Sequence, residues 1–237
     1  MTPQGDAPIV VLASRSYPNH LPNPIFVLYS NGRVIFGDPR TPAYRTCLLP
    51  ADQVSDLYSR LSPKVLAAWD NEVFTPGGSS APTYYLFVRR DDGSFVSMAS
   101  YNLSPGSGPV VWPEATQPPS AVMQALEFLA EYDCEAASPW TPAEIEVAFE
   151  LQASGPLPEQ KAWWPKTWPQ PKLNQRQIPT IRLDSSHAEE LNEHLRRDGI
   201  VRIGSQAFDV DPRYPFPYEE SVVAPMNALA RKGGVFP

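Results

Sequence analysis

Cysteine is scarce in this 237-residue chain, and long apolar runs are absent. Cys47 and Cys134 are too few for a disulfide framework or a cysteine-ligated zinc site. The opening residues, MTPQGDAPIVVLASRS, lack the basic start of a signal peptide, and no later stretch reaches the roughly 18 apolar residues of a membrane span. We therefore expect a cytoplasmic protein, with Cys47 in an inert structural role.

The chain also lacks the motifs that would indicate a catalytic or metal site. It has no G-x-S-x-G elbow, no P-loop and no G-x-G-x-x-G. His187 and His194 share a helix face with Glu190, but seven residues separate them by about 10 Å along the axis, too far for one zinc ion. We expect no metal, no cofactor and no catalytic residues. An enzyme acting on a small molecule, with His20 beside Cys47 in a pocket framed by proline-rich loops, is the alternative.

Lysine and arginine are missing from residues 91 to 160, where the chain's own frequency predicts about five or six. The same block holds eleven acids, whereas the remainder of the chain has 19 bases and 15 acids. In TPAEIEVAFELQ the acids alternate with apolar residues, which predicts a strand with one acidic face. Glu127 and Glu131 lie one turn apart on a predicted helix. Like charges at these spacings repel, so we expect a cation to face them.

That cation has an internal source. The segment 161–182 carries five bases and no acid: Lys161, Lys166, Lys172, Arg176 and Arg182. Arg182 alternates with apolar neighbours and would lie opposite a glutamate if its strand pairs with the acidic one. Five bases do not balance eleven acids, so a net acidic face would remain.

Proline is abundant, with 29 residues against the roughly 5% of average usage, which indicates many rigid, irregular connections. Between them, PIFVLYSNGRVIFGD and TYYLFVRRDDGSFVSMASYN predict two hairpins, turning at Asn31-Gly32 and Asp92-Gly93. An amphipathic helix follows each one, which suggests a strand–strand–helix pseudo-repeat in residues 1–134. The two apolar stripes are Val54, Leu57, Tyr58 and Leu61, and Val122, Ala125, Leu126 and Leu129.

A third unit closes the chain. IPTIRL predicts a strand, Ser186 with Glu189 a capping box that opens a helix through Arg197, and IVRIGSQAFDV a hairpin. We therefore expect an α+β fold with a mainly antiparallel sheet built from hairpins. About three amphipathic helices would cover one face, and proline- and tryptophan-rich coil the other. The prediction is a single compact unit, 1–237, with possible sub-lobes 1–134 and 135–237.

The coil in question is KAWWPKTWPQP, which places three tryptophans among prolines and lysines. FVLYS and YYLFV are apolar on both strand faces, so Trp163, Trp164 and Trp168 are expected to form a lid over the sheet. The alternative is a single-stranded nucleic-acid binder that stacks bases on these indoles within residues 161–182. The net charge of −7 argues against it.

Together these patterns favour a non-enzymatic, cytoplasmic protein-binding protein with an acidic surface. An immunity or inhibitor protein that neutralises a basic, toxin-like partner has this charge distribution. No membrane partner is expected. The predicted partner-binding residues are the acids Glu127, Glu131, Asp133, Glu135, Glu144, Glu146 and Glu150, and the aromatic anchors Trp163, Trp164 and Trp168.

Overall fold

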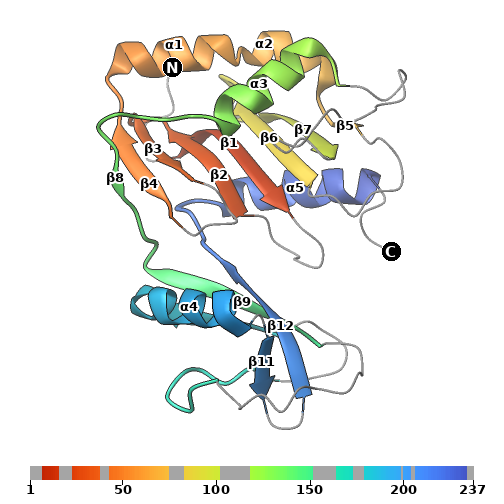
Figure 1. Ribbon diagram of the computed structural model, residues 1–237. Coiled ribbons are helices and arrows are strands. Elements are labelled where there is room, and N and C mark those ends of the chain that lie inside the picture. Colours follow the sequence, from red (N-terminus) through yellow and green to blue (C-terminus); the bar gives the residue numbers. More distant parts are fainter. Residues whose placement is uncertain are drawn as a thin grey trace. The chain divides into compact units, whose positions relative to one another are not determined.

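The computed structural model describes residues 7–15, 23–37, 43–74, 83–101, 118–151, 164–172, 179–198, 200–203 and 206–233. The chain divides into a larger unit, Met1–Trp140 with Phe216–Pro237, and a smaller unit, Thr141–Pro215 (Figure 1). The fold is mixed α+β with a large, mainly antiparallel sheet, as predicted. The predicted division after residue 134 differs, because the last segment of the chain returns to the larger unit.

The larger unit is built on an eight-stranded sheet in the order β5-β7-β6-β1-β2-β3-β4-β8. β5 runs parallel to β7, and the other neighbouring strands are antiparallel. The strands are β1 (Pro8–Arg15), β2 (Asn23–Tyr29), β3 (Arg33–Phe36), β4 (Arg45–Leu48), β5 (Glu72–Phe74), β6 (Thr83–Arg89), β7 (Phe95–Tyr101) and β8 (Ser138–Pro139).

The turn between β2 and β3 shows how the sequence sets this topology. An Asn-Gly turn of two residues needs positive φ at both positions, but here Gly32 has φ +87° and Asn31 does not have a positive φ. The Gly32 amide donates to the Tyr29 carbonyl at 3.0 Å, and the Arg33 amide donates to Asn31 Oδ1 at 3.0 Å. The connection is therefore three residues long, with the left-handed residue last. The Gly32 carbonyl then accepts from the Leu49 amide at 2.9 Å, which ties the turn to the segment after β4.

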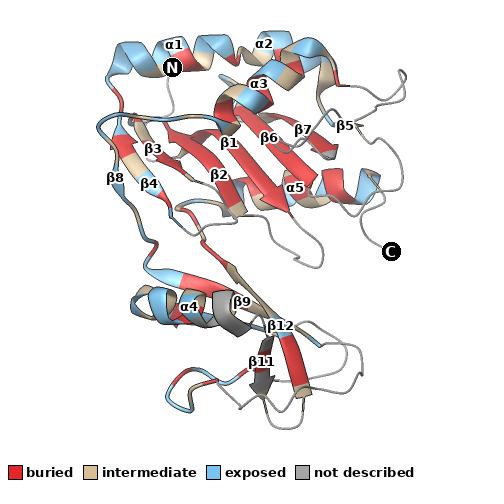
Figure 2. Ribbon diagram, in the orientation of Figure 1, coloured by how far each residue is buried: buried red, intermediate tan, exposed pale blue. Residues whose placement is uncertain are grey.

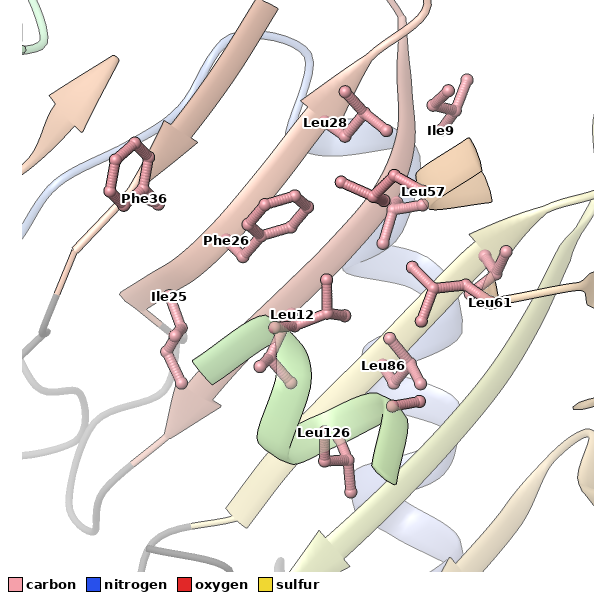
Figure 3. Close-up of a cluster of buried hydrophobic side chains, with 14 of the residues drawn as sticks. Ile9, Leu12, Ile25, Phe26, Leu28, Phe36, Leu57, Leu61, Leu86 and Leu126 are labelled. Atoms are coloured by element: carbon pink, nitrogen blue, oxygen red, sulfur yellow. The ribbon is translucent and has the colours of Figure 1, made fainter. Parts of the chain in front are cut away.

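One face of this sheet is covered by α1 (Ala51–Arg60), α2 (Pro63–Leu66), the short helix η1 (Ala67–Trp69) and α3 (Ser120–Ala130) (Figure 1). The core beneath them joins strand side chains such as Leu12, Phe26 and Leu86 to Leu57 and Leu126 of the helices (Figure 3). The apolar stripes of α1 and α3 therefore bury against the sheet, which is the main stabilising contact such helices make.

The opposite face is covered by α5 (Glu220–Lys232), which packs on β7 and β5 through Val222, Met226 and Leu229. Lys232 Nζ at its end donates to the Asn71 carbonyl at 2.7 Å. Tryptophan-rich coil was predicted here, and that part of the prediction is corrected. The sequence analysis missed this helix because Pro225 interrupts it, and proline normally breaks a helical pattern.

The smaller unit holds a four-stranded antiparallel sheet in the order β10-β9-β12-β11. Its strands are β9 (Glu144–Leu151), β10 (Thr180–Asp184), β11 (Ile200–Ile203) and β12 (Gln206–Arg213). After β10 comes η3 (Ser185–His187), which continues into α4 (Ala188–Asp198). The cap is Asp184, whose carboxylate accepts from the Ser186 amide at 2.9 Å, two residues earlier than the predicted Ser186 box. α4 thus belongs to this unit and not to the larger sheet.

The two sheets differ in how far their strands are buried. The central strands of the larger sheet are buried along their length, whereas β9 combines buried residues with intermediate and exposed ones (Figure 2). An antiparallel sheet with one covered and one partly solvated face produces this pattern. Within the described residues, no helix has the length and apolar character needed to cross a membrane.

Gly32 provides a sharp test of the turn. In Gly32→Ala the new Cβ would lie well inside 3.0 Å of the Leu49 carbonyl oxygen, a backbone atom, and φ would remain strained. We expect the free energy of unfolding of the larger unit to fall by about 2 to 4 kcal/mol. Gly93→Ala is the matched control: φ is also +87°, but the nearest atom is the flexible Arg89 Nη2 at 3.6 Å, so about 1 kcal/mol is expected. Urea denaturation of both variants measures the difference, and equal losses would contradict the assigned clash.

Candidate functional site

One face of the smaller sheet is apolar and closed by tryptophan. Ile145, Val147 and Phe149 of β9 are buried on it. Trp164 meets Phe149 edge to face with ring centroids 4.9 Å apart, and Trp168 meets Trp164 at 5.1 Å. The indole nitrogen of Trp164 donates to the Pro169 carbonyl at 3.0 Å, which satisfies the polar atom of the buried ring. These two indoles form a lid, but on the smaller sheet.

This burial changes the predicted site. Trp164 and Trp168 are 7% and 5% exposed, so they have almost no surface to offer a partner or a stacked base. They also pack with Phe149, whose side chain lies on the face of β9 opposite to Glu144, Glu146 and Glu150. We therefore remove them from the candidate binding surface. Trp163, Lys161 and Arg176 lie outside the described residues.

The other face of the smaller sheet is charged, and the strand register places its residues. Arg182 of β10 and Arg213 of β12 both lie opposite Glu146 of β9, one on each side. Arg182 Nη2 lies 3.1 Å from Glu146 Oε1, and Arg213 Nη1 binds Glu146 Oε2. Arg182 Nη1 also lies 3.5 Å from Glu144 Oε2. The predicted pairing of Arg182 with the acidic strand is thus present, and Arg213 is a second cation that the sequence analysis did not identify.

These ion pairs hold three strands together. Glu146 and Arg213 are both buried, so each depends on the other to offset its lost hydration. Removing one partner would leave an uncompensated buried charge. The Arg182–Glu144 contact is solvent-exposed on both sides and adds little. Glu146 therefore has a structural role as well as a place on the charged face.

Six carboxylates lie on this face by register, and we call them the acidic face: Glu144, Glu146, Glu150, Asp184, Asp209 and Asp211. Two of the cross-strand pairs join acid to acid, since Asp184 is opposite Glu144 and Asp209 is opposite Glu150. Like charges in directly opposed positions are destabilising. The face is therefore charged at a cost to the stability of its own sheet.

Two carboxyl groups of the acidic face have raised pKa values. Burial, together with the charge of Asp209, raises the pKa of Glu150. Burial alone raises the pKa of Asp211 to about 6. Hydrogen bonds from the Ser186 hydroxyl and amide have the opposite effect on Asp184 and lower its pKa. Glu150 and Asp211 are thus held where the charged form is disfavoured.

The remaining predicted acids lie in the larger unit. Glu127, Glu131, Asp133 and Glu135 are exposed, on α3 or just after it. Asp133 forms an ion pair with Arg45 at 2.9 Å between Arg45 Nη2 and Asp133 Oδ1. The predicted set therefore divides between two units, and Asp184, Asp209 and Asp211 are additions that only the strand register reveals.

The enzyme alternative finds little support among these residues. Burial raises the pKa of Cys47 to about 12, so its thiol is protonated at neutral pH. His20 lies outside the described residues. In the part of the chain that the structure covers, no group of three or more His, Cys, Asp or Glu side chains is placed to hold a metal ion.

Comparison with known proteins adds no relative. No family model matches the chain, and the searches of curated proteins and of solved structures return no significant match.

Asp211→Asn tests the cost of the buried carboxylate. The folded pKa of about 6 lies above the ordinary 3.8, so the folded state holds the proton more tightly and stability falls as pH rises between about 4 and 6. We expect the variant to be more stable than the parent by about 1 to 2 kcal/mol at pH 7 and equal to it at pH 3.5. Asp184→Asn is the control with the opposite sign, since its pKa is lowered. Urea unfolding at both pH values decides, and a pH-independent Asp211→Asn effect would contradict the assignment.

Proposed function

We propose that this protein is a non-enzymatic binding protein whose acidic face docks on a basic protein. The observation that supports this most is the charge of one sheet face, where register places six carboxylates together with Arg182, Arg202 and Arg213. Arg182 and Arg213 are engaged by Glu146, and Arg182 also reaches Glu144. The carboxyl groups of this face with raised pKa values are Glu150 and Asp211.

A cationic partner would stabilise the ionised forms of these carboxyl groups. A lysine or arginine beside Glu150 and Asp211 would favour their ionised forms and bring their raised pKa values down. Binding would then release protons, so affinity would increase as pH rises through about 6. Complementary charge also accelerates encounter and selects against acidic partners.

The sheet supports such a role by presenting the face rigidly. Glu146 fixes β10 and β12 on either side of β9, and the tryptophan lid fixes the opposite side of β9. A surface that is ordered before binding loses less conformational entropy when it binds. Because Trp164 and Trp168 are buried, recognition of the partner would depend on the charges of the acidic face and on the geometry of its strands.

The partner class that fits this charge is a basic toxin, which makes the protein an immunity or inhibitor protein acting in the cytoplasm. Nucleic acid fits less well, because phosphate binding needs cations and the acidic face repels it. Two of the tryptophans proposed for base stacking are also buried.

The test compares two charge-matched variants of the full chain as bait. The face variant carries Glu150→Gln, Asp209→Asn and Asp211→Asn, and the control carries Glu127→Gln, Glu131→Gln and Glu135→Gln on the larger unit. We expect the parent and the control to retain a basic protein from host lysate, and the amount retained by the face variant to be at least tenfold lower. Because salt screens charge, capture by the parent is expected to weaken as salt rises from roughly 50 to 300 mM. Equal retention by both variants would contradict the proposal.

The captured protein then tests the inhibitor class. Once purified, its toxicity or enzymatic activity is expected to be suppressed by an equimolar amount of the parent chain and not by the face variant. Suppression that survives the three face substitutions would place the docking surface elsewhere. A captured partner without any suppressed activity would contradict the inhibitor class while leaving the docking result intact.

A further inference from the structure

The larger unit brings together the only two cysteines of the chain, although 86 residues separate them in the sequence. Cys47 lies on β4, and Cys134 follows the end of α3. The two side chains are near enough for Cys134 to raise the pKa of Cys47, and both thiols are free. Cys134 also packs against the core cluster that contains Cys47. The sequence analysis treated the two cysteines separately and did not predict this contact.

The backbone on both sides of the pair is held in place. Arg45 lies two residues before Cys47, and Asp133 directly precedes Cys134. These two side chains form an ion pair at 2.9 Å. Thr46 pairs with Ser138 where β4 meets β8, and the Ala137 amide donates to the Cys134 carbonyl at 3.0 Å. Contacts therefore flank the two thiols along both segments. Two cysteines held in this way can be bridged without large backbone movement.

We propose that Cys47 and Cys134 form a redox-responsive pair that closes to an intramolecular disulfide by exchange with a small-molecule disulfide such as oxidised glutathione. Cys134 is half-buried and Cys47 is 7% exposed, so the order of the two steps follows from access. The site is independent of the acidic face, since both cysteines belong to the larger unit.

The exchange balances in two steps. The Cys134 thiolate attacks one sulfur of oxidised glutathione, forming a mixed disulfide and releasing one glutathione thiolate. Cys47 then loses its proton, and its sulfur attacks Cys134 Sγ and releases the second glutathione. Two protein thiols are oxidised to one disulfide, and one small-molecule disulfide is reduced to two thiols.

The surroundings of Cys47 set the speed of the closing step. Burial is the main reason why its pKa is raised, and the contact with Cys134 adds to this. The Tyr132 hydroxyl and the Arg45 guanidinium both act in the opposite direction and lower the pKa of Cys47. Asp133 is the remaining charged group nearby and is engaged by Arg45. Closure is therefore slow at neutral pH, and it accelerates about tenfold per pH unit as the Cys47 thiolate becomes populated.

Closure would fasten β4 to the segment that leads into β8. The bridge would close a loop of roughly 90 residues, and long loops are those in which a crosslink most restricts the unfolded chain. The expected consequence is an upward shift of about 10 °C in the unfolding temperature of the larger unit.

The experiment incubates the full chain with oxidised or reduced glutathione at pH 7, 8 and 9, followed by mass spectrometry and thermal unfolding. We expect a monomer lighter by two hydrogen atoms, a linked peptide pair containing Cys47 and Cys134, faster closure at higher pH, and the upward thermal shift that reduction reverses. Thiols that stay free in excess oxidised glutathione, or crosslinks between two chains, would overturn the proposal.

Two variants separate the steps. Cys47→Ala is expected to stop at the mixed disulfide and gain the mass of one glutathione on Cys134. Cys134→Ala is expected to remain unmodified, because its one remaining thiol is buried. The bridge needs both cysteines, so oxidation should not raise the unfolding temperature of either variant. A rise as large as that of the parent chain would also overturn the proposal. The parent chain alone decides the matter if a variant folds poorly, since peptide mapping identifies the bridge directly.

Discussion

Strands β1 and β6 are buried along almost their whole length, so the eight-stranded sheet needs a layer of cover on each of its faces. Among the described residues of the first 140, the helices α1, α2 and α3 cover one of these faces. The second layer is α5, which lies at the end of the chain. The smaller unit is consequently an insertion, joined to the larger one at both of its ends. The need to cover both faces thus explains why the domain division does not follow the order of the sequence.

The sheet of the smaller unit also has an apolar face that needs cover. The tryptophan lid covers one face of this sheet, and the other face carries the charged residues. A charged face of this kind must be stabilised from within, and Glu146 does so by engaging an arginine of each neighbouring strand. The buried pair with Arg213 makes strand register and charge balance interdependent, because a slip of β12 by one residue would move Arg213 to the face opposite to Glu146.

Much of this arrangement was predictable from local patterns. Period-two alternation identified β9 and the orientation of Glu144, Glu146 and Glu150, and the apolar stripes identified α1 and α3. The pairing of Arg182 with the acidic strand followed from the same alternation. What failed depended on contacts between distant segments. Asp209, Asp211 and Arg213 join the charged face through β12, and neither local charge counting nor helical periodicity marks them. The contact between Cys47 and Cys134 has no local signal at all.

The charge of the acidic face is difficult to explain by folding alone. Six carboxylates lie on it by register with Arg182, Arg202 and Arg213, and two of its cross-strand pairs join acid to acid. The raised pKa values of Glu150 and Asp211 show that ionising these groups opposes the folded state. Asparagine or glutamine at the same positions would keep the strand geometry without that cost. Under the proposed function, a cationic partner beside these carboxylates would reverse the sign of their contribution.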